Sequence, residues 1–146
     1  MKIEVKIEST YTEPIIIIMT DRMTEEVNEI VRKLSNGVPQ MIAGFQDEFL
    51  KVLDQEDIFW IYAKNGKVFA STGSGEYSLR TRLYEMEDRL DRNNFVRISN
   101  SEIINLRKVK AFDLSLAGTI QVSLLNGTVT YVSRRYVSKI KQVLGV

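Results

Sequence analysis

The stretch that decides the fold is 58-IFWIYAKNGKVFAS-71, in which two apolar, aromatic-rich runs flank the dipeptide Asn65-Gly66. Asn and Gly tolerate the positive φ angles that a two-residue turn between antiparallel strands requires. The runs Ile58–Ala63 and Lys67–Ser71 are therefore predicted to pair as a β-hairpin.

Further strands are predicted on both sides of this hairpin. They are short apolar, β-branched or aromatic runs bounded by turn residues, and they cover about residues 41–45, 48–53, 95–98, 109–115, 119–125 and 128–132. Asn126-Gly127 separates the last two runs, which predicts a second hairpin. The expected fold class is mainly β.

A few short helices are expected among these strands, because apolar residues there recur at helical spacing. They lie around Val27–Leu34, over about 82–91 and over about 135–144. The expected start and stop residues are Asp21 or Thr24 before the first helix, Asn36-Gly37 and Pro39 after it, Ser78 or Thr81 before the second, and Asn93-Asn94 after it.

Residues 1–41 are predicted to form a small strand–strand–helix lobe ahead of a β-rich domain over residues 42–146. Lys2–Glu8 alternates charged and apolar residues, as a half-buried strand does, and Pro14–Met19 is typical of a strand buried on both faces. Such a lobe cannot bury a core alone. It must pack on a second copy, which would give a homodimer, or cap the sheet of its own chain, and the sequence leaves both open.

The composition excludes several kinds of site. The chain has 146 residues, 44% of them hydrophobic and 27% charged, as is usual for a globular domain. It contains no His and no Cys, which rules out disulfides, thiol nucleophiles, Ser-His-Asp triads and His-ligated zinc. Glu25-Glu26 and Glu56-Asp57 are expected on solvated surfaces, and Gly73 and Gly75 make a lone G-x-G. Neither enzymatic activity nor a cofactor or metal ion is expected.

The formal net charge of +1 hides an uneven distribution. Residues 1–57 hold six Lys and Arg against twelve Asp and Glu, whereas residues 94–146 hold eight against two. The basic C-terminal third indicates either a footprint for an anion such as nucleic acid or simply the solvated face of a dipolar domain. The longest apolar run, Ile15–Met19, is far below the roughly 20 residues that span a bilayer, and no signal peptide is seen, so we expect a cytoplasmic protein.

Five segments, taken in order along the chain, carry a family resemblance. They are Asp57–Ile61, Asn65–Val68, Leu83–Glu87, Phe95–Asn105 and Val132–Tyr136. Together they resemble the LytTR-type DNA-binding domain of bacterial transcriptional regulators, over roughly residues 42–146. The resemblance implies an elongated, almost all-β fold of small antiparallel sheets, which presents loops to successive grooves of duplex DNA. The implied partner is promoter DNA with repeated half-sites.

The chain is also similar to the stand-alone members of that family, because 40 residues cannot supply a phosphate-accepting receiver domain. Control by phosphorylation is therefore not expected. In such systems the gene often lies beside one for a small membrane protein that restrains the regulator, so the resemblance implies a partner of this kind.

The resemblance implies three regions of DNA contact. Base contacts are expected from Asn100, from Arg135 and from the Lys64–Lys67 turn through Lys67, at a turn where some relatives place a His that this chain lacks. Contacts to the DNA backbone are expected from Lys64, Asn65, Ser99, Ser101, Arg107, Lys108 and Arg134, and Lys67 and Lys110 also suit phosphate. The chemistry agrees, since Arg matches the guanine edge, Asn can pair with adenine or donate to phosphate, and Lys supplies sequence-independent attraction.

Each of these assignments has a structural alternative. Asn105 is better explained as a side chain that stabilises a turn, and one of Arg134 and Arg135 can simply be solvated at the start of a helix. The aromatic residues Phe59, Trp60, Phe95 and Phe112 are expected in the core. For the whole chain the alternative to a DNA-binding regulator is a protein–protein interaction module, for example an anti-activator, that docks a partner without binding DNA.

Overall fold

The computed structural model describes residues 1–35 and 41–146, which form two units, Met1–Gly37 and Val38–Val146. The helix stop predicted at Asn36-Gly37 and Pro39 lies outside the described residues. The domain boundary after residue 41 stays a prediction. No helix in the described ranges is long and apolar enough to cross a membrane.

The N-terminal unit contains one helix in its described part, α1 (Glu25–Ser35). Thr24 caps it: its Oγ1 accepts the Val27 N–H at 3.3 Å, and its carbonyl accepts the Asn28 N–H at 2.9 Å. The strands predicted at 2–8 and 14–19 are wrong, because residues 1–24 contain no strand. Their alternation and apolar content mark side chains that could be buried, but a strand also needs a neighbour to pair its backbone groups.

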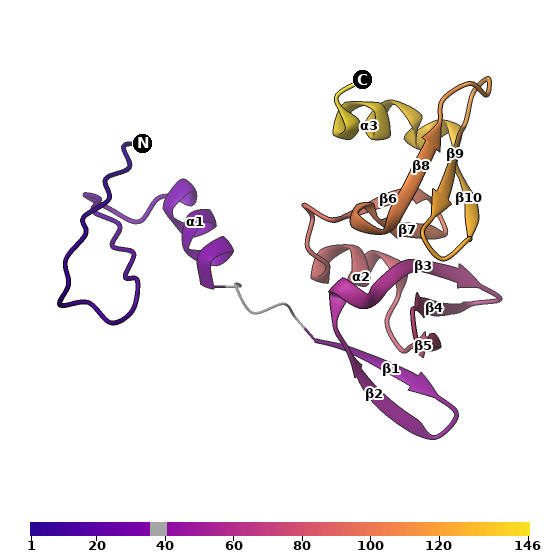
Figure 1. The fold of residues 1–146 in the computed structure, drawn as a ribbon, viewed down its shortest axis with the longest axis horizontal. Helices are drawn as coiled ribbons and strands as arrows, with labels where there is room; N and C mark the ends of the chain where they lie inside the picture. Colours follow the sequence, from indigo (N-terminus) through magenta and orange to yellow (C-terminus); the bar gives the residue numbers. More distant parts are fainter. Residues whose placement is uncertain (36–40) are drawn as a thin grey trace. The chain divides into compact units, whose positions relative to one another are not determined.

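The larger unit contains two antiparallel sheets (Figure 1). The large sheet has seven strands in the order β2-β1-β5-β4-β3-β7-β6, with the bounds β1 (Ile42–Gln46), β2 (Phe49–Leu53), β3 (Ile58–Lys64), β4 (Lys67–Thr72), β5 (Gly75–Leu79), β6 (Phe95–Ser99) and β7 (Glu102–Asn105). The small sheet has the order β10-β9-β8, with β8 (Val109–Asp113), β9 (Ile120–Leu124) and β10 (Val129–Val132). The expected mainly β class is confirmed.

Two α-helices and two 3₁₀ turns complete this unit: α2 (Leu83–Arg89), α3 (Arg134–Leu144), η1 (Gln55–Asp57) and η2 (Leu106–Lys108). The second helix begins close to its predicted position, but the predicted caps Ser78 and Thr81 are wrong: Arg82 is the N-cap of α2 and makes no side-chain capping bond, while Ser78 lies in β5. Gly145 ends α3 in the left-handed conformation, at φ 74°.

Both Asn-Gly hairpins are confirmed. Asn65 and Gly66 have φ angles of 53° and 75°, and they join β3 to β4 with Lys64 opposite Lys67. Gly127 has a φ of 90° in the connection between β9 and β10. Strands β5 and β7 were not predicted. Each has a paired strand on both sides, so pairing with its neighbours makes so short a segment a strand.

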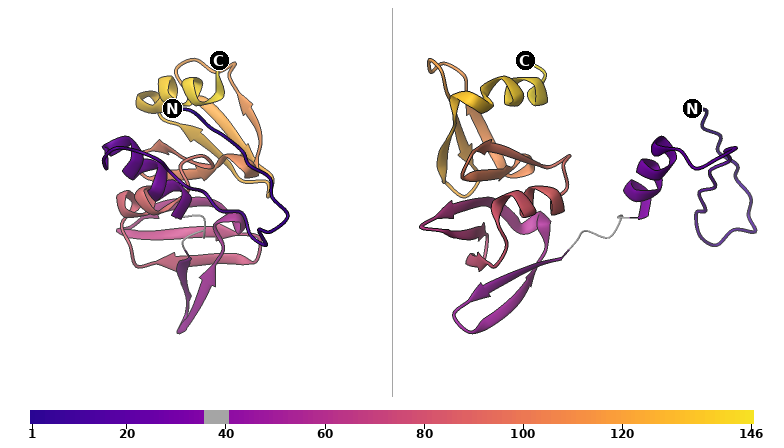
Figure 2. Two further views of the ribbon diagram at one scale, coloured as in Figure 1. Left: turned by 90° about the vertical axis from the view of Figure 1, so that its left-hand side faces the viewer. Right: turned by 180° about the vertical axis from the view of Figure 1, so that it is seen from behind.

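Two hydrophobic cores hold the larger unit together. Figure 2 shows the ribbons of the elements that enclose them, with the yellow helix α3 beside the orange strands of the small sheet. The first lies between the large sheet and α2 and includes Ile61, Met86 and Ile103. The second is shared by β6, β7, the small sheet and α3, and includes Ile104 and Ile140. The neighbours Ile103 and Ile104 in β7 enter different cores, since successive strand residues point to opposite faces. The end of β7 is therefore held from both sides.

Candidate nucleic-acid interface

The turn Lys64–Lys67 and the turn at Ser99–Ser101 lie at the same edge of the large sheet. β3 and β7 are antiparallel neighbours, with Tyr62 opposite Glu102, so the end of β3 meets the beginning of β7. The Ala63 N–H donates to the Ser101 carbonyl at 2.8 Å and ties the two turns together. Two of the regions expected to contact DNA are thus adjacent in the structure.

The start of α3 joins them. Its N-cap residue Ser133 donates its backbone N–H to the Ile98 carbonyl at 2.9 Å, one residue before the second turn. One helical turn further, the Tyr136 hydroxyl donates to Oδ1 of Asn100 at 3.3 Å. Arg134 and Arg135 follow Ser133 in the first turn of α3, so the backbone that carries them lies close to the Asn100 turn. All three expected contact regions therefore meet along one edge.

The side chains presented at this edge are exposed, and all of them except Asn100 carry positive charge. Lys64, Lys67, Asn100 and Arg135 are all exposed. The described residues form three ion pairs, Lys2–Glu4, Arg92–Asp88 and Arg97–Glu87, and none of them involves Lys64, Lys67 or Arg135. These cations face water, where a phosphate can approach them.

Arg134 is also exposed but lies against the β8–β9 connection. A Cβ added to Gly118 would come within 3.2 Å of Arg134 Nε, so the small residue makes room for the guanidinium. Gly118 also has a φ of 73°, which favours glycine independently.

Arg97 lies beneath the Asn100 turn and was not predicted as a site residue. Its Nε donates to the Ser99 carbonyl at 2.8 Å and its Nη2 donates to the Asn100 carbonyl at 2.6 Å. Its Nη1 forms an ion pair with Glu87 of α2 at 2.7 Å. The sequence around Arg97 did not indicate this role, because only the fold brings Glu87 to Arg97.

Glu102 was likewise missed. Its Oε1 accepts the Trp60 indole N–H at 2.9 Å and the Thr130 hydroxyl at 2.6 Å, and Ser99 Oγ lies 3.5 Å from its Oε2. It connects the large sheet to the small sheet just beside the Asn100 turn. Its partners are 42 and 28 residues away in the sequence, so no local pattern could have revealed them.

Arg107 and Lys108 are not brought to this edge. They follow β7 at its other end, roughly 10 Å along the strand at 3.3 Å per residue. Arg107 Nε donates to Asn94 Oδ1 at 2.8 Å, and the Lys108 ammonium lies 5.0 Å from the centre of the Phe59 ring. A duplex that touches them must extend beyond the Asn100 edge.

The structural explanation of Asn105 is confirmed. It is 2% exposed, its Nδ2 donates to the Ile58 carbonyl at 2.9 Å, and its Oδ1 accepts the Arg107 N–H at 3.0 Å. Phe95 is buried in the first core, and Phe59, Trp60 and Phe112 pack against the second. The aromatic residues therefore pack in or against the two cores, as expected.

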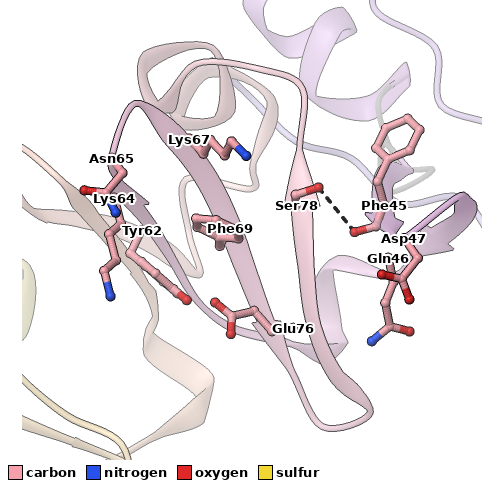
Figure 3. Close-up of a pocket in the computed structure, with 10 residues that line it drawn as sticks. All are labelled: Phe45, Gln46, Asp47, Tyr62, Lys64, Asn65, Lys67, Phe69, Glu76 and Ser78. Atoms are coloured by element: carbon pink, nitrogen blue, oxygen red, sulfur yellow. Dashed lines mark hydrogen bonds between the residues drawn. The ribbon is translucent and has the colours of Figure 1, made fainter.

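An open cleft adjoins the Lys64–Lys67 turn (Figure 3). Its volume is about 600 Å³, and a row of residues paired across β3, β4, β5 and β1 crosses it: Tyr62, Phe69, Ser78 and Phe45. Lys64, Asn65 and Lys67 line it on the side of the turn. The turn is thus exposed on its sheet face as well as at its tip. Within the described ranges, no three His, Cys, Asp or Glu side chains group to hold a metal ion.

Known proteins resemble this chain in sequence and in fold. The LytTr DNA-binding domain family matches residues 49–145. An uncharacterized HTH-type transcriptional regulator of Staphylococcus aureus (strain NCTC 8325 / PS 47) is 31% identical over 147 residues, which cover 100% of this chain and 99% of that protein. A second such regulator, from strain MRSA252, is 30% identical with the same coverage. A solved LytTr DNA-binding domain from Bacillus cereus has the same fold, with a TM-score of 0.70 at 23% identity, covering 73% of this chain and 97% of that one. The chain therefore belongs to the LytTr DNA-binding domain family.

Proposed function

We propose that this protein is a sequence-specific transcriptional regulator that reads duplex DNA with the edge formed by the Lys64–Lys67 turn, the Asn100 turn and the start of α3. The observation that carries the proposal is the hydrogen bond from Tyr136 to Asn100, which joins two of these regions. The relatives in Staphylococcus aureus are named transcriptional regulators, which supports this role. The protein would act by binding and not by catalysis, in the cytoplasm where bacterial promoters are found.

The proposed division of labour follows the chemistry of each side chain. Base contacts are assigned to Asn100, Arg135 and Lys67, because an amide and a guanidinium can read base edges and the Lys67 side chain is exposed at its turn. Lys67 is assigned a phosphate contact as well, since an ammonium attracts phosphate independently of the base sequence. Backbone contacts are assigned to Lys64, Asn65, Ser99, Ser101, Arg107, Lys108 and Arg134. The relatives carry HTH-type in their names, but in the described part of this chain strands separate each helix from the next, so turns are the more suitable reading elements.

We further propose that residues 1–41 form a homodimerisation lobe and residues 42–146 the DNA-binding domain. Ile15, Ile16 and Ile17 are 65–78% exposed, and α1 carries the apolar stripe Ile30, Val31 and Leu34 at helical spacing. Apolar surface of this extent favours burial against another chain. A dimer also suits DNA with repeated half-sites. Capping of the chain's own sheet is the competing arrangement, and restraint by a small membrane protein stays a prediction.

A selection from a random duplex pool tests the main proposal. The full chain is expected to enrich one sequence family, and its affinity for the enriched duplex should fall steeply as salt rises, because phosphate contacts release counterions. A titration in which enriched and scrambled duplexes bind equally, with no salt dependence, would show the DNA-binding assignment to be wrong. That outcome would favour the protein–protein interaction module.

A further inference from the structure

We infer that Arg97 is the positioning residue of the DNA-reading edge: it holds the Asn100 turn in shape from beneath, anchored by Glu87 of α2, and does not itself contact DNA. The inference rests on the proposed function, because it assigns a role within the same edge. It adds a helix, α2, that lies outside the contact regions proposed above.

The backbone of the Asn100 turn differs from that of a regular two-residue hairpin turn. Asn100 and Ser101 alone connect β6 to β7, with Ser99 opposite Glu102. Two-residue hairpin turns are stable when their central residues have positive φ angles, since these match the twist of the strands. Neither Asn100 nor Ser101 is among the residues with positive φ, in contrast to Asn65-Gly66. A register shift between Arg97 and Ser99 adds a residue to β6 and accommodates the mismatch.

Arg97 holds the two carbonyls of this turn from beneath. Its Nε and Nη2 reach the carbonyls of Ser99 and Asn100, at 2.8 and 2.6 Å. Two consecutive carbonyls thus accept from the fixed fork of one guanidinium, which a lysine ammonium cannot reproduce. Arg97 therefore fixes the backbone of Asn100, the residue whose side chain is proposed to read DNA.

The third nitrogen of the guanidinium is anchored on α2. Nη1 lies 2.7 Å from Glu87 Oε2, and the Arg97 side chain is 15% exposed. Helix α2 is fixed in turn by Met86, which is 1% exposed in the first core. All three nitrogens of Arg97 thus donate inside the protein, which leaves this cation poorly placed to neutralise a phosphate.

The chain offers a matched control for this ion pair. Arg92 and Asp88 pair at 3.4 Å near the end of the same helix, but their side chains are 80% and 72% exposed. An exposed pair of this kind contributes little. Arg92→Gln and Asp88→Asn therefore change charge in the same region without touching the Asn100 turn.

The experiment compares Arg97→Gln, Arg97→Lys, Glu87→Gln and the two control variants. Affinity is measured for the selected duplex and a scrambled duplex, over a range of salt. Arg97→Gln is expected to lower the ratio of the two affinities about tenfold or more, an effect of the size of one base contact, with the slope against salt unchanged because no phosphate contact is lost. Arg97→Lys should not restore the ratio, Glu87→Gln should give a smaller loss, and the controls should match the wild type.

A second readout does not involve DNA. Amide hydrogen exchange of Ala63, whose N–H donates to the Ser101 carbonyl, should become faster in Arg97→Gln and stay unchanged in Arg92→Gln. If Arg97→Gln fails to fold, the ratio of affinities and the amide exchange of Ala63 are measured on Glu87→Gln instead.

The possible failures can be told apart. Wild-type protein that does not discriminate between duplexes refutes the proposed function, and with it the role in DNA reading. Discrimination that is normal in the wild type and unchanged in Arg97→Gln refutes the positioning role alone. A salt slope reduced by about 1 in Arg97→Gln would instead identify Arg97 as a phosphate contact.

Discussion

The Tyr136 hydroxyl donates a hydrogen bond to Oδ1 of Asn100 across 3.3 Å, from the first turns of α3 to the turn between β6 and β7. This bond determines which end of the Asn100 amide faces outward. Oδ1 accepts this bond, whereas Nδ2 has no partner among the residues that the structure describes. Asn100 is thus presented as a hydrogen-bond donor, which suits an acceptor on a base edge or a phosphate oxygen.

Tyr136→Phe should weaken binding to the selected duplex by roughly fivefold, because a typical hydrogen bond contributes about 1 kcal/mol. Binding to a scrambled duplex should be nearly unchanged. The free energy of unfolding should also change little, since the ring still packs against the second core. Fluorescence anisotropy with both duplexes checks this, with Tyr131→Phe, an exposed tyrosine on β10, as the control. Equal losses in the two variants would contradict it.

Arg135→Ala and Lys67→Ala should weaken DNA binding in different ways. Removing Arg135 is expected to abolish discrimination at its base pair, at a cost of about 1–3 kcal/mol, with weak binding retained. Lys67→Ala should weaken binding across all sequences and reduce the salt slope by about 1. Titrations of several duplexes at several salt concentrations separate the two effects. If Arg135→Ala lowers the affinity for all duplexes equally, Arg135 is a phosphate contact and not a base contact.

Lys108→Ala tests how far the duplex extends. Lys108 lies at the end of β7 remote from Asn100, over the Phe59 ring. If DNA reaches this end, the substitution should lower affinity uniformly and flatten the salt dependence, as Lys67→Ala does. An unchanged affinity and slope would confine the interface to the Asn100 edge and remove Lys108 from it.

Asn105→Ala should be a stability variant and not a binding variant. It leaves the Ile58 carbonyl and the Arg107 N–H without their side-chain partner in a buried position, which costs about 2 kcal/mol or more. Urea unfolding should show this loss, while the affinity of the folded fraction for DNA stays near that of the wild type. Asn93→Ala, at an exposed residue, is the control. A large loss of affinity at unchanged stability would reverse the assignment.

A variant comprising residues 42–146 tests the N-terminal lobe. It should stay folded, because both cores are formed by residues of the larger unit, from Ile42 to Ile140. Light scattering is expected to show a dimer for the full chain and a monomer for the shortened one. The shortened protein should then bind DNA with two half-sites more weakly. Monomers in both cases would exclude the homodimer.

The sequence by itself determined the features that depend on neighbouring residues. Asn65-Gly66 and Asn126-Gly127 specify their turns because few other dipeptides tolerate the required φ angles. Thr24 and the periodic apolar residues after it specify α1, and the excess of Lys and Arg after residue 94 places positive charge in the part of the chain that holds Asn100 and Arg135.

Tertiary structure decided everything that depends on a distant partner. β5 and β7 are strands because strands flank them, whereas residues 2–8 and 14–19 alternate or are apolar and yet form none. The ion pair of Arg97 with Glu87 and the contacts of Glu102 with Trp60 and Thr130 exist because the chain brings those side chains together. Local sequence fixes φ angles and periodicity, but a hydrogen bond between remote residues depends on the whole fold, and such bonds set the orientation of Asn100.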